Sequence, residues 1–439
     1  MTDLNTSPVP SSVTSVHATD AARQRLNKRK AANKRFRLYG MAGVVIAIAA
    51  LVMLLSTLVV QGYSAFYTHT MELTITLEQD VLDRNNTQDP AILARANYRK
   101  LVKNEVYSLF DDVTSRRDKR AVSALISNGA IDALREAVLD DPTIIGSTIT
   151  ITAPVSDDID MLLKGHIDRN VEEQLRRVSD RQIAWTDSLV ERGIIKRAFN
   201  TYFFTQGDSR EPELAGIWGA VKGSFYTMVV TLLISFPVAV GAAVYLEEFA
   251  AKNRFTALVE VNINNLAAVP SIVFGLLGLA IFLNFFEMPR SAPLVGGMVL
   301  ALMTVPTIII AARAALKAVP PSIREAALGV GASPMQAVFQ HVLPLAMPGI
   351  LTGTILGLAQ ALGETAPLLM IGMVAFIVDI PGGITDPASA LPVQIYLWAD
   401  SPERAFVEKT SGAIIVLLVF LITMNAAATI LRKRLERRW

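Results

Sequence analysis

The chain contains 439 residues, of which 52% are hydrophobic and 18% charged, with a formal net charge of +2. Soluble domains contain about 25% charged residues, and here the apolar residues fall in long blocks, a distribution typical of membrane proteins. The absence of cysteine excludes disulfides, thiolate nucleophiles and cysteine-based metal sites. The four histidines are scattered and no G-x-x-x-x-G-K-[ST] motif occurs, so we expect no metal, no cofactor and no P-loop for ATP.

The N-terminal region predicts a tail followed by a membrane anchor. Residues 1–38 start with Ser, Thr, Pro and Asn and continue with a basic run, so we predict a disordered, basic cytoplasmic tail. Residues 39–61 form the first predicted transmembrane helix, because a block of this length spans roughly 30 Å of hydrocarbon. A cleaved signal peptide is the alternative, but the block is long for one and no clear cleavage site follows.

Residues 62–215 differ from both neighbouring regions, because they are polar, carry charges of both signs and contain no apolar span. Helical apolar spacing occurs over Ala124–Leu139 and Val171–Ile195, and strand-like alternation over Thr143–Val155. We predict a folded α+β domain on the periplasmic side of the membrane. Its carboxylates form no recognisable motif, so we interpret it as an interaction or spacer domain.

Residues 216–439 contain the remaining apolar blocks. Five further transmembrane helices are predicted, at Tyr226–Leu246, Leu266–Leu283, Val295–Leu316, Gly349–Val378 and Ile414–Leu431. The basic residues between and after these blocks fall on the same side as the basic N-terminus, which predicts that both termini are cytoplasmic. We therefore expect an all-α polytopic membrane protein with six transmembrane helices and an α+β domain inserted between the first and second.

The cytoplasmic loop 317–347 has the pattern of two short helices. Pro320 and Pro321 end the preceding helix, and Ser322 with Glu325 three residues later is a capping-box pattern that predicts a new helix. Its first turns carry small side chains, which allow close approach to another protein. Either Gly329 or Gly331 can end this helix in the left-handed conformation.

A second helix is predicted to follow directly. Ser333 is the expected N-cap, Pro334 occupies the first helical position and Gln336 completes an S-x-x-Q capping box. This helix should run towards Leu343–Pro344. The loop is thus predicted to be a helix–turn–helix at the membrane surface.

The same loop resembles the EAA loop of ABC importer permeases. Glu325-Ala326-Ala327, Gly331 and Leu343-Pro344 match the motif at the right spacing, and His341 departs from it because the family usually has an aliphatic residue there. In that family the loop is the coupling helix that enters a cleft of the ATPase subunit. The resemblance implies that Glu325 and its neighbours face a nucleotide-binding partner, in addition to any role in helix capping.

Two further stretches, 262–279 and 363–369, resemble the PstA-type permeases of bacterial phosphate ABC importers. The resemblance covers roughly residues 215–439 and implies the ABC type I importer permease fold in the bacterial inner membrane. It implies three protein partners: a PstC-type second permease, a PstB-type ATPase dimer that binds the ATP, and a PstS-type periplasmic phosphate-binding protein. The membrane lipid is a further expected partner. No nucleic-acid partner and no catalytic residue are expected, since the chain supplies a pathway and its coupling.

Glu364 is the main candidate for the substrate pathway. An ionisable group in an apolar span is costly and is a functional candidate by default, and Gly363 and Pro367 beside it predict a broken helix. Gln360 lies one turn earlier and Thr365 adds a hydroxyl group. Because a lone carboxylate repels phosphate, Glu364 must be protonated, paired with a cation, or accept a proton from the substrate; a structural hydrogen bond is the alternative.

The cation for an oxyanion is harder to identify. PstA-type proteins often have an arginine where this chain has Gln360, so the cation would come from the second permease or from Arg313. Arg313 lies near the inner end of its helix, where extension towards the cytoplasmic interface is the competing interpretation. Asn262, with Asn264 and Asn265, either lines the pore or bonds between helices.

Three rival functions remain at this point. A permease for another substrate, such as molybdate, sulfate or an amino acid, would have much the same sequence pattern. A membrane-anchored sensor would explain the tail, the anchor and the external domain, but would leave the later spans and the loop unexplained. A membrane enzyme lacks support because the spans contain no clustered His, Asp or Ser groups with catalytic spacing.

Overall fold

The computed structural model describes residues 20–435, and the chain divides into two compact units, Met1–Val59 and Val60–Trp439. A single long helix, α1 (Asp20–Gly62), makes up the described part of the first unit. Residues 20–38, predicted to be disordered, are therefore helical, and 1–19 lie outside the described residues. Arg, Lys, Gln and Ala are good helix formers, and no proline separates them from the apolar block, so the helix continues through both.

A small antiparallel sheet follows in the second unit, with strand order β2-β1-β3. Its strands are β1 (Tyr67–Thr76), β2 (Thr148–Pro154) and β3 (Ile195–Phe199). The predicted strand within Thr143–Val155 corresponds to β2, and its central residue Ile151 pairs with Leu73 of β1. Alternate residues of β1 are buried, as expected for a sheet with one face on a core.

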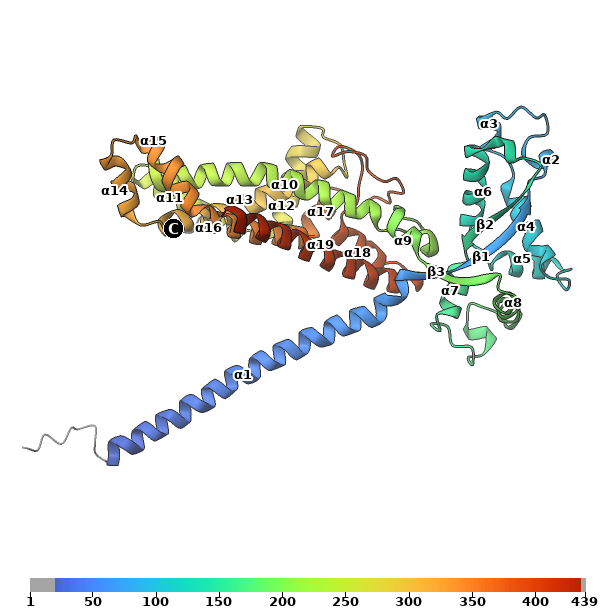
Figure 1. Ribbon diagram of the computed structural model, residues 1–439, viewed down its shortest axis with the longest axis horizontal. Helices are drawn as coiled ribbons and strands as arrows, with labels where there is room; N and C mark the ends of the chain where they lie inside the picture. The colour runs from blue at the N-terminus through green and yellow to red at the C-terminus, as the bar shows by residue number, and fades with distance from the viewer. Residues whose placement is uncertain (1–19, 436–439) are drawn as a thin grey trace, which may run out of the picture. The chain divides into compact units, whose positions relative to one another are not determined.

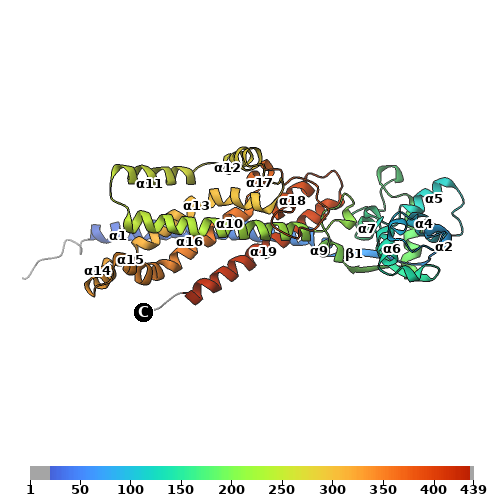
Figure 2. The ribbon, with the colours of Figure 1, turned by 90° about the horizontal axis from the view of Figure 1, so that it is seen from above.

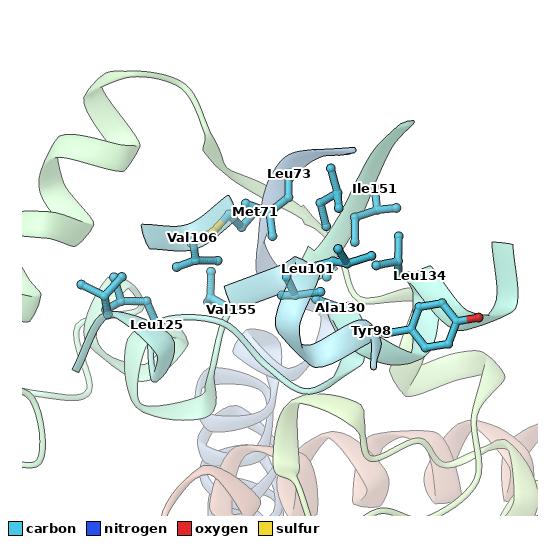
Figure 3. Close-up of a cluster of buried hydrophobic side chains, with 14 of the residues drawn as sticks. Met71, Leu73, Tyr98, Leu101, Val106, Leu125, Ala130, Leu134, Ile151 and Val155 are labelled. Atoms are coloured by element: carbon cyan, nitrogen blue, oxygen red, sulfur yellow. The ribbon is translucent and has the colours of Figure 1, made fainter. Parts of the chain in front are cut away.

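Short helices cover one face of this sheet. They are α2 (Gln79–Leu82), α3 (Pro90–Leu93), α4 (Tyr98–Ser108), α5 (Arg116–Ser123), α6 (Gly129–Asp140), α7 (Asp157–Leu163) and α8 (Asp180–Glu191). Figure 3 shows Leu101 and Leu134 packed with Leu73 and Ile151, all of them buried. The helical spacing seen in the sequence thus corresponds to α6 and α8, and these elements enclose one apolar core.

The rest of the second unit is a bundle of long helices (Figure 1). The principal ones are α10 (Trp218–Val244), α13 (Pro293–Lys317), α16 (Leu343–Gly363) and α19 (Ala405–Leu435). Shorter helices are α9 (Thr201–Thr205), α14 (Pro321–Gly329), α15 (Pro334–Ala337), α17 (Ala366–Met370) and α18 (Leu391–Ala399). Counting α1, five described helices are long and apolar enough to cross a membrane, and one bent pair could add a sixth.

The bent pair corrects the predicted span Leu266–Leu283. The chain forms α11 (Arg254–Ala267) and α12 (Ser271–Gly278), the latter extended by a π-helical segment to Phe285, and the two axes differ by 99°. Figure 2 shows them as separate helices. Pro270 causes the break, because proline cannot donate a backbone hydrogen bond and disfavours helical geometry in the residue before it.

Small residues bring α13 and α16 close together. Gly349 and Gly353 are four residues apart and so lie on one face of α16, opposite Ala315 and Ala311 of α13. A Cβ atom added at Gly353 would lie 2.2 Å from the Cβ of Ala311, and one at Gly349 would lie 2.7 Å from that of Ala315. This small-residue spacing permits close backbone packing, as is common between membrane helices.

A buried ion cluster attaches the sheet region to the start of α19. The ammonium group of Lys164 lies 2.6 Å from Asp160 and 2.7 Å from Glu408 of α19, and its side chain is 1% exposed. Burial lowers the pKa of Lys164, but the two carboxylates more than offset this and hold it above its usual value. Removing one partner of such a cluster would leave a buried charge unpaired, which is strongly unfavourable.

The packing of α13 on α16 makes a direct prediction. Gly353→Ala should destabilise the protein by about 1–3 kcal/mol, because its new methyl group overlaps Ala311. Ala311→Gly in the same chain should restore most of the loss. Thermal unfolding in detergent measures both, with Gly241→Ala as the control because an added Cβ there meets nothing within 4 Å. Equal melting temperatures for Gly353→Ala and Gly241→Ala would contradict the packing.

Candidate functional site

The loop between α13 and α16 forms two helices, as predicted, but the first begins differently. Helix α14 has Pro320 as its N-cap and Pro321 in its first turn, and no side chain caps it. The predicted capping box of Ser322 and Glu325 is therefore wrong. The reason is that Pro321 already adopts the first helical position, which its fixed φ favours, so Ser322 lies inside the helix rather than before it.

Gly331 ends α14 in the left-handed conformation, with φ of +90°. Its N–H donates to the carbonyl of Leu328 at 3.0 Å, and the N–H of Ala332 donates to that of Ala327 at 3.1 Å. These two bonds form a Schellman motif, the usual glycine-dependent helix end. Of the two glycines considered from the sequence, Gly331 is the one with positive φ.

The second capping box is confirmed. The backbone N–H of Gln336 donates to the hydroxyl of Ser333 at 3.2 Å, and that of Ser333 donates to Oε1 of Gln336 at 2.9 Å. Helix α15 then continues through a π-helical turn, Val338–Val342, into α16. The turn directly precedes Leu343 and Pro344, where a wider turn accommodates the proline that an α-helix resists.

Helix α14 has one face towards the protein and one face free. Ala327 is buried, whereas Glu325 and Ala326 are exposed. Apolar side chains also lie open at the end of the loop, since Val330 is 86% exposed and Leu328 48%. A short helix that presents one carboxylate among small and apolar side chains is suited to insertion into a groove of another protein.

Arg324 fixes the other face of α14, a role that the sequence analysis missed. Its guanidinium donates two hydrogen bonds to the carboxylate of Glu248, at 2.6 and 3.0 Å. It also donates to the carbonyls of Leu316 and Val319, at 3.0 and 2.8 Å. The two-pronged pairing with a carboxylate is the geometry that arginine favours.

Arg313 lies at the same end of the bundle and is paired with carboxylates. Its guanidinium donates to Glu260 of α11 at 2.6 Å and to Glu247 at 3.4 Å, and Lys317 lies 3.5 Å from Glu247. The arginine considered as a cation for substrate thus joins α11 to α13. Glu247 and Glu248 belong to the π-helical turn Tyr245–Phe249 that extends α10.

Glu364 lies at a helix break, as predicted. Helix α16 ends at Gly363, Glu364 has extended backbone angles, and α17 begins at Ala366. The side chains of Glu364 and Thr365 are half-buried, and that of Gln360, one turn earlier, is exposed. The Glu364 carboxylate forms no hydrogen bond or ion pair with any residue within 24–434.

The asparagines predicted for the pathway lie on α11. Asn262, Asn264 and Asn265 are exposed, and Asn262 donates to the carbonyl of Leu258 in its own helix at 2.8 Å. Helix α11 packs on α13, whereas α12 packs on α17, where a Cβ added at Gly275 would lie 2.7 Å from Cα of Pro367. Figure 2 shows α11 nearer to α14 than α17 is, so the candidates form two groups along the bundle.

Two protein families match parts of the chain. Residues 215–439, slightly more than half of the chain, match the family described as "Binding-protein-dependent transport system inner membrane component". Residues 23–173 match a family described as "Domain of unknown function (DUF3333)". Among solved structures, the chain is similar to the inward-facing MetNI methionine ABC transporter, at 20% sequence identity and a TM-score of 0.40. This similarity covers 51% of this chain and 95% of the transporter chain.

Curated relatives give the same assignment. The phosphate transport system permease protein PstA 1 of Mycobacterium tuberculosis is 30% identical over 58% of this chain and 77% of its own length. The phosphate transport system permease protein PstA of Haemophilus influenzae is 30% identical over 54% and 82%. The chain is a transport component rather than an enzyme, and it belongs to the family of inner membrane components of binding-protein-dependent transport systems.

Proposed function

We propose that the chain is a PstA-type permease subunit of an ATP-driven phosphate importer. The observation that carries this proposal is the relationship to phosphate permeases in Mycobacterium tuberculosis and Haemophilus influenzae, at 30% identity over about three quarters or more of their length. The two-helix loop with Gly331 at its turn supports the coupling part of the proposal. The chain forms part of the phosphate pathway and transmits work done by a separate ATPase.

The proposed topology has six spans, with α11 and α12 together forming one of them. Helix α10 ends beside α14, and α13 begins on the side of the bundle away from α14 and runs back towards it (Figures 1 and 2). The bent pair between them must therefore return across the membrane. The sheet region lies at the end away from α14, and the basic residues that end α19 lie at the α14 end.

These positions support a cytoplasmic α14, a cytoplasmic C-terminus and a periplasmic sheet domain in the bacterial inner membrane. The basic residues within 1–38 support a cytoplasmic N-terminus in the same proposal. The proposed divisions are a basic tail at 1–38, a first transmembrane helix at 39–61, a periplasmic domain at 62–215 and a permease core at 216–439. The coupling loop occupies 317–347. The sheet and its helices, from Tyr67 to Phe199, fall within the proposed periplasmic domain.

The proposed partners are a PstC-type second permease, two copies of a PstB-type ATPase and a PstS-type phosphate-binding protein. ATP binding draws the two ATPase subunits together, and the coupling helices that sit on them follow. The pathway then opens outward, and hydrolysis returns it inward. Glu325, Ala326 and the exposed end of α14 face the ATPase in this scheme.

The break between α16 and α17 is the proposed substrate region. Glu364 is half-buried and its backbone is extended, so main-chain groups that a continuous helix would use are available to a ligand. Gln360 and Thr365 add uncharged donors. A cation for the phosphate comes from the second permease in this proposal, since Arg313 already has two carboxylate partners.

Uptake of radiolabelled phosphate tests the function. In a strain that lacks its other phosphate transporters, expression of this chain with its partners should restore phosphate uptake. Unlabelled sulfate or molybdate in about 100-fold excess, enough to occupy a site that binds it weakly, should leave that uptake unchanged. No phosphate uptake, or competition by either oxyanion, would contradict the proposed substrate.

The turn at Gly331 gives a second test. Gly331→Val should abolish uptake while membrane insertion stays normal, because a β-branched residue resists the φ of +90° found there. Gly331→Asn should keep part of the activity, since asparagine tolerates the left-handed region better. Gly329→Ala is the matched control, because its φ is not positive and an added Cβ meets nothing within 4 Å. Normal uptake by Gly331→Val would count against the docking role of the loop.

A further inference from the structure

The contacts of Arg324 connect the loop to the transmembrane helices. One side chain on α14 reaches Glu248 at the end of α10 and two carbonyl groups at the end of α13. Glu248 is nearly buried, with 7% of its side chain exposed, and that of Arg324 is 25% exposed. Four hydrogen bonds to one partly buried guanidinium restrict its position far more than an exposed ion pair would.

The backbone alone does not fix α14. At its start Pro320 has ψ of 138°, which interrupts the helix that comes from α13, and at its end Gly331 provides the left-handed turn. Its apolar attachment is small, consisting mainly of buried Ala327 and half-buried Ile323. The ion pair with Glu248 is therefore the strongest directional contact between α14 and the long helices.

The neighbouring carboxylate continues the connection. Glu247, next to Glu248 in the same π-helical turn, lies 3.4 Å from Arg313 and 3.5 Å from Lys317, both on α13. Arg313 in turn lies 2.6 Å from Glu260 on α11. We call these six residues the Arg324 network: Glu247, Glu248, Glu260, Arg313, Lys317 and Arg324. These ion pairs thus link α14 to the ends of α10 and α13 and to the middle of α11.

We propose that the Arg324–Glu248 pair transmits the movement of α14 to the transmembrane helices. When an ATPase displaces α14, this pair makes the ends of α10 and α13 move with it, and Glu247 and Arg313 extend the motion to α11. Arg324 is a positioning residue and touches neither ATP nor substrate. The inference rests on the proposed coupling to an ATPase, but it does not depend on the identity of the substrate.

The pair is tested in the complete importer reconstituted in liposomes. Arg324→Gln should lower the substrate transported per ATP hydrolysed by at least about fivefold, the lower end of typical coupling effects. The KM for ATP should not change, since that site belongs to the partner. Lys252→Gln is the matched control, because Lys252 is an exposed cation in the loop between α10 and α11. If Arg324→Gln and Lys252→Gln transport the same amount of substrate per ATP hydrolysed, the proposal is overturned.

A second variant guards against a failure of assembly. Glu248→Gln removes the charge but leaves the carbonyl contacts of Arg324, so it should fold and still lower the ratio. The double variant should be no worse than Arg324→Gln alone, because both changes disrupt one contact. A wild-type ratio for Glu248→Gln, or additive losses in the double variant, would contradict transmission through this pair.

A distance measurement separates this inference from the proposed substrate. The chain has no cysteine, so spin labels can be placed at Ser322→Cys at the start of α14 and Ala251→Cys after α10, both exposed positions. The distance between them should be narrowly distributed and unchanged when ATP binds, and Arg324→Gln should broaden it. If the distance distribution is narrow in a complex that does not transport phosphate, the proposed substrate is wrong but the proposed role of the Arg324–Glu248 pair stands. An identical distribution in Arg324→Gln would refute the pair.

Discussion

Close packing of α13 against α16 is the contact on which the rest of the bundle depends. Glycines on α16 meet alanines on α13, and the same two helices lead into and out of the loop that contains α14. Because their packing fixes both ends of the loop, α14 needs only a few contacts to be held in one orientation. Arg324 supplies the most directional of these contacts, through Glu248 and the end of α13.

The two broken helices follow from a second constraint, that backbone groups within a membrane must find partners inside the protein. Helix breaks are tolerated where other helices surround them. The break at Pro270 leads into α12, and α12 packs on α17 directly after the break at Glu364. Gly275 allows this approach, since any larger residue would meet the backbone of Pro367. The helix that follows one break thus packs on the helix that follows the other.

Local signals in the sequence predicted much of this arrangement. The Ser333 capping box, the turn at Gly331 and the break at Glu364 all depend on neighbouring residues, and all are present. The Ser322 capping box failed because Pro321 competes for the helix start. Mean hydropathy identifies the apolar stretch Leu266–Leu283 but hides the bend at Pro270, so the expected straight helix is part of a bent pair. The pairs Arg324–Glu248 and Lys164–Glu408 join residues 76 and 244 positions apart, and no local pattern reveals them.

The central claim is that α14 is the surface on which an ATPase sits. Ala326 is exposed on this helix, and the chain has no other thiol, so Ala326→Cys can be labelled selectively with a maleimide. Its labelling rate in membranes should fall sharply when the ATPase subunits are present, relative to the same membranes without them. An equal rate in the two membranes, with the complex shown to be assembled, would contradict the account.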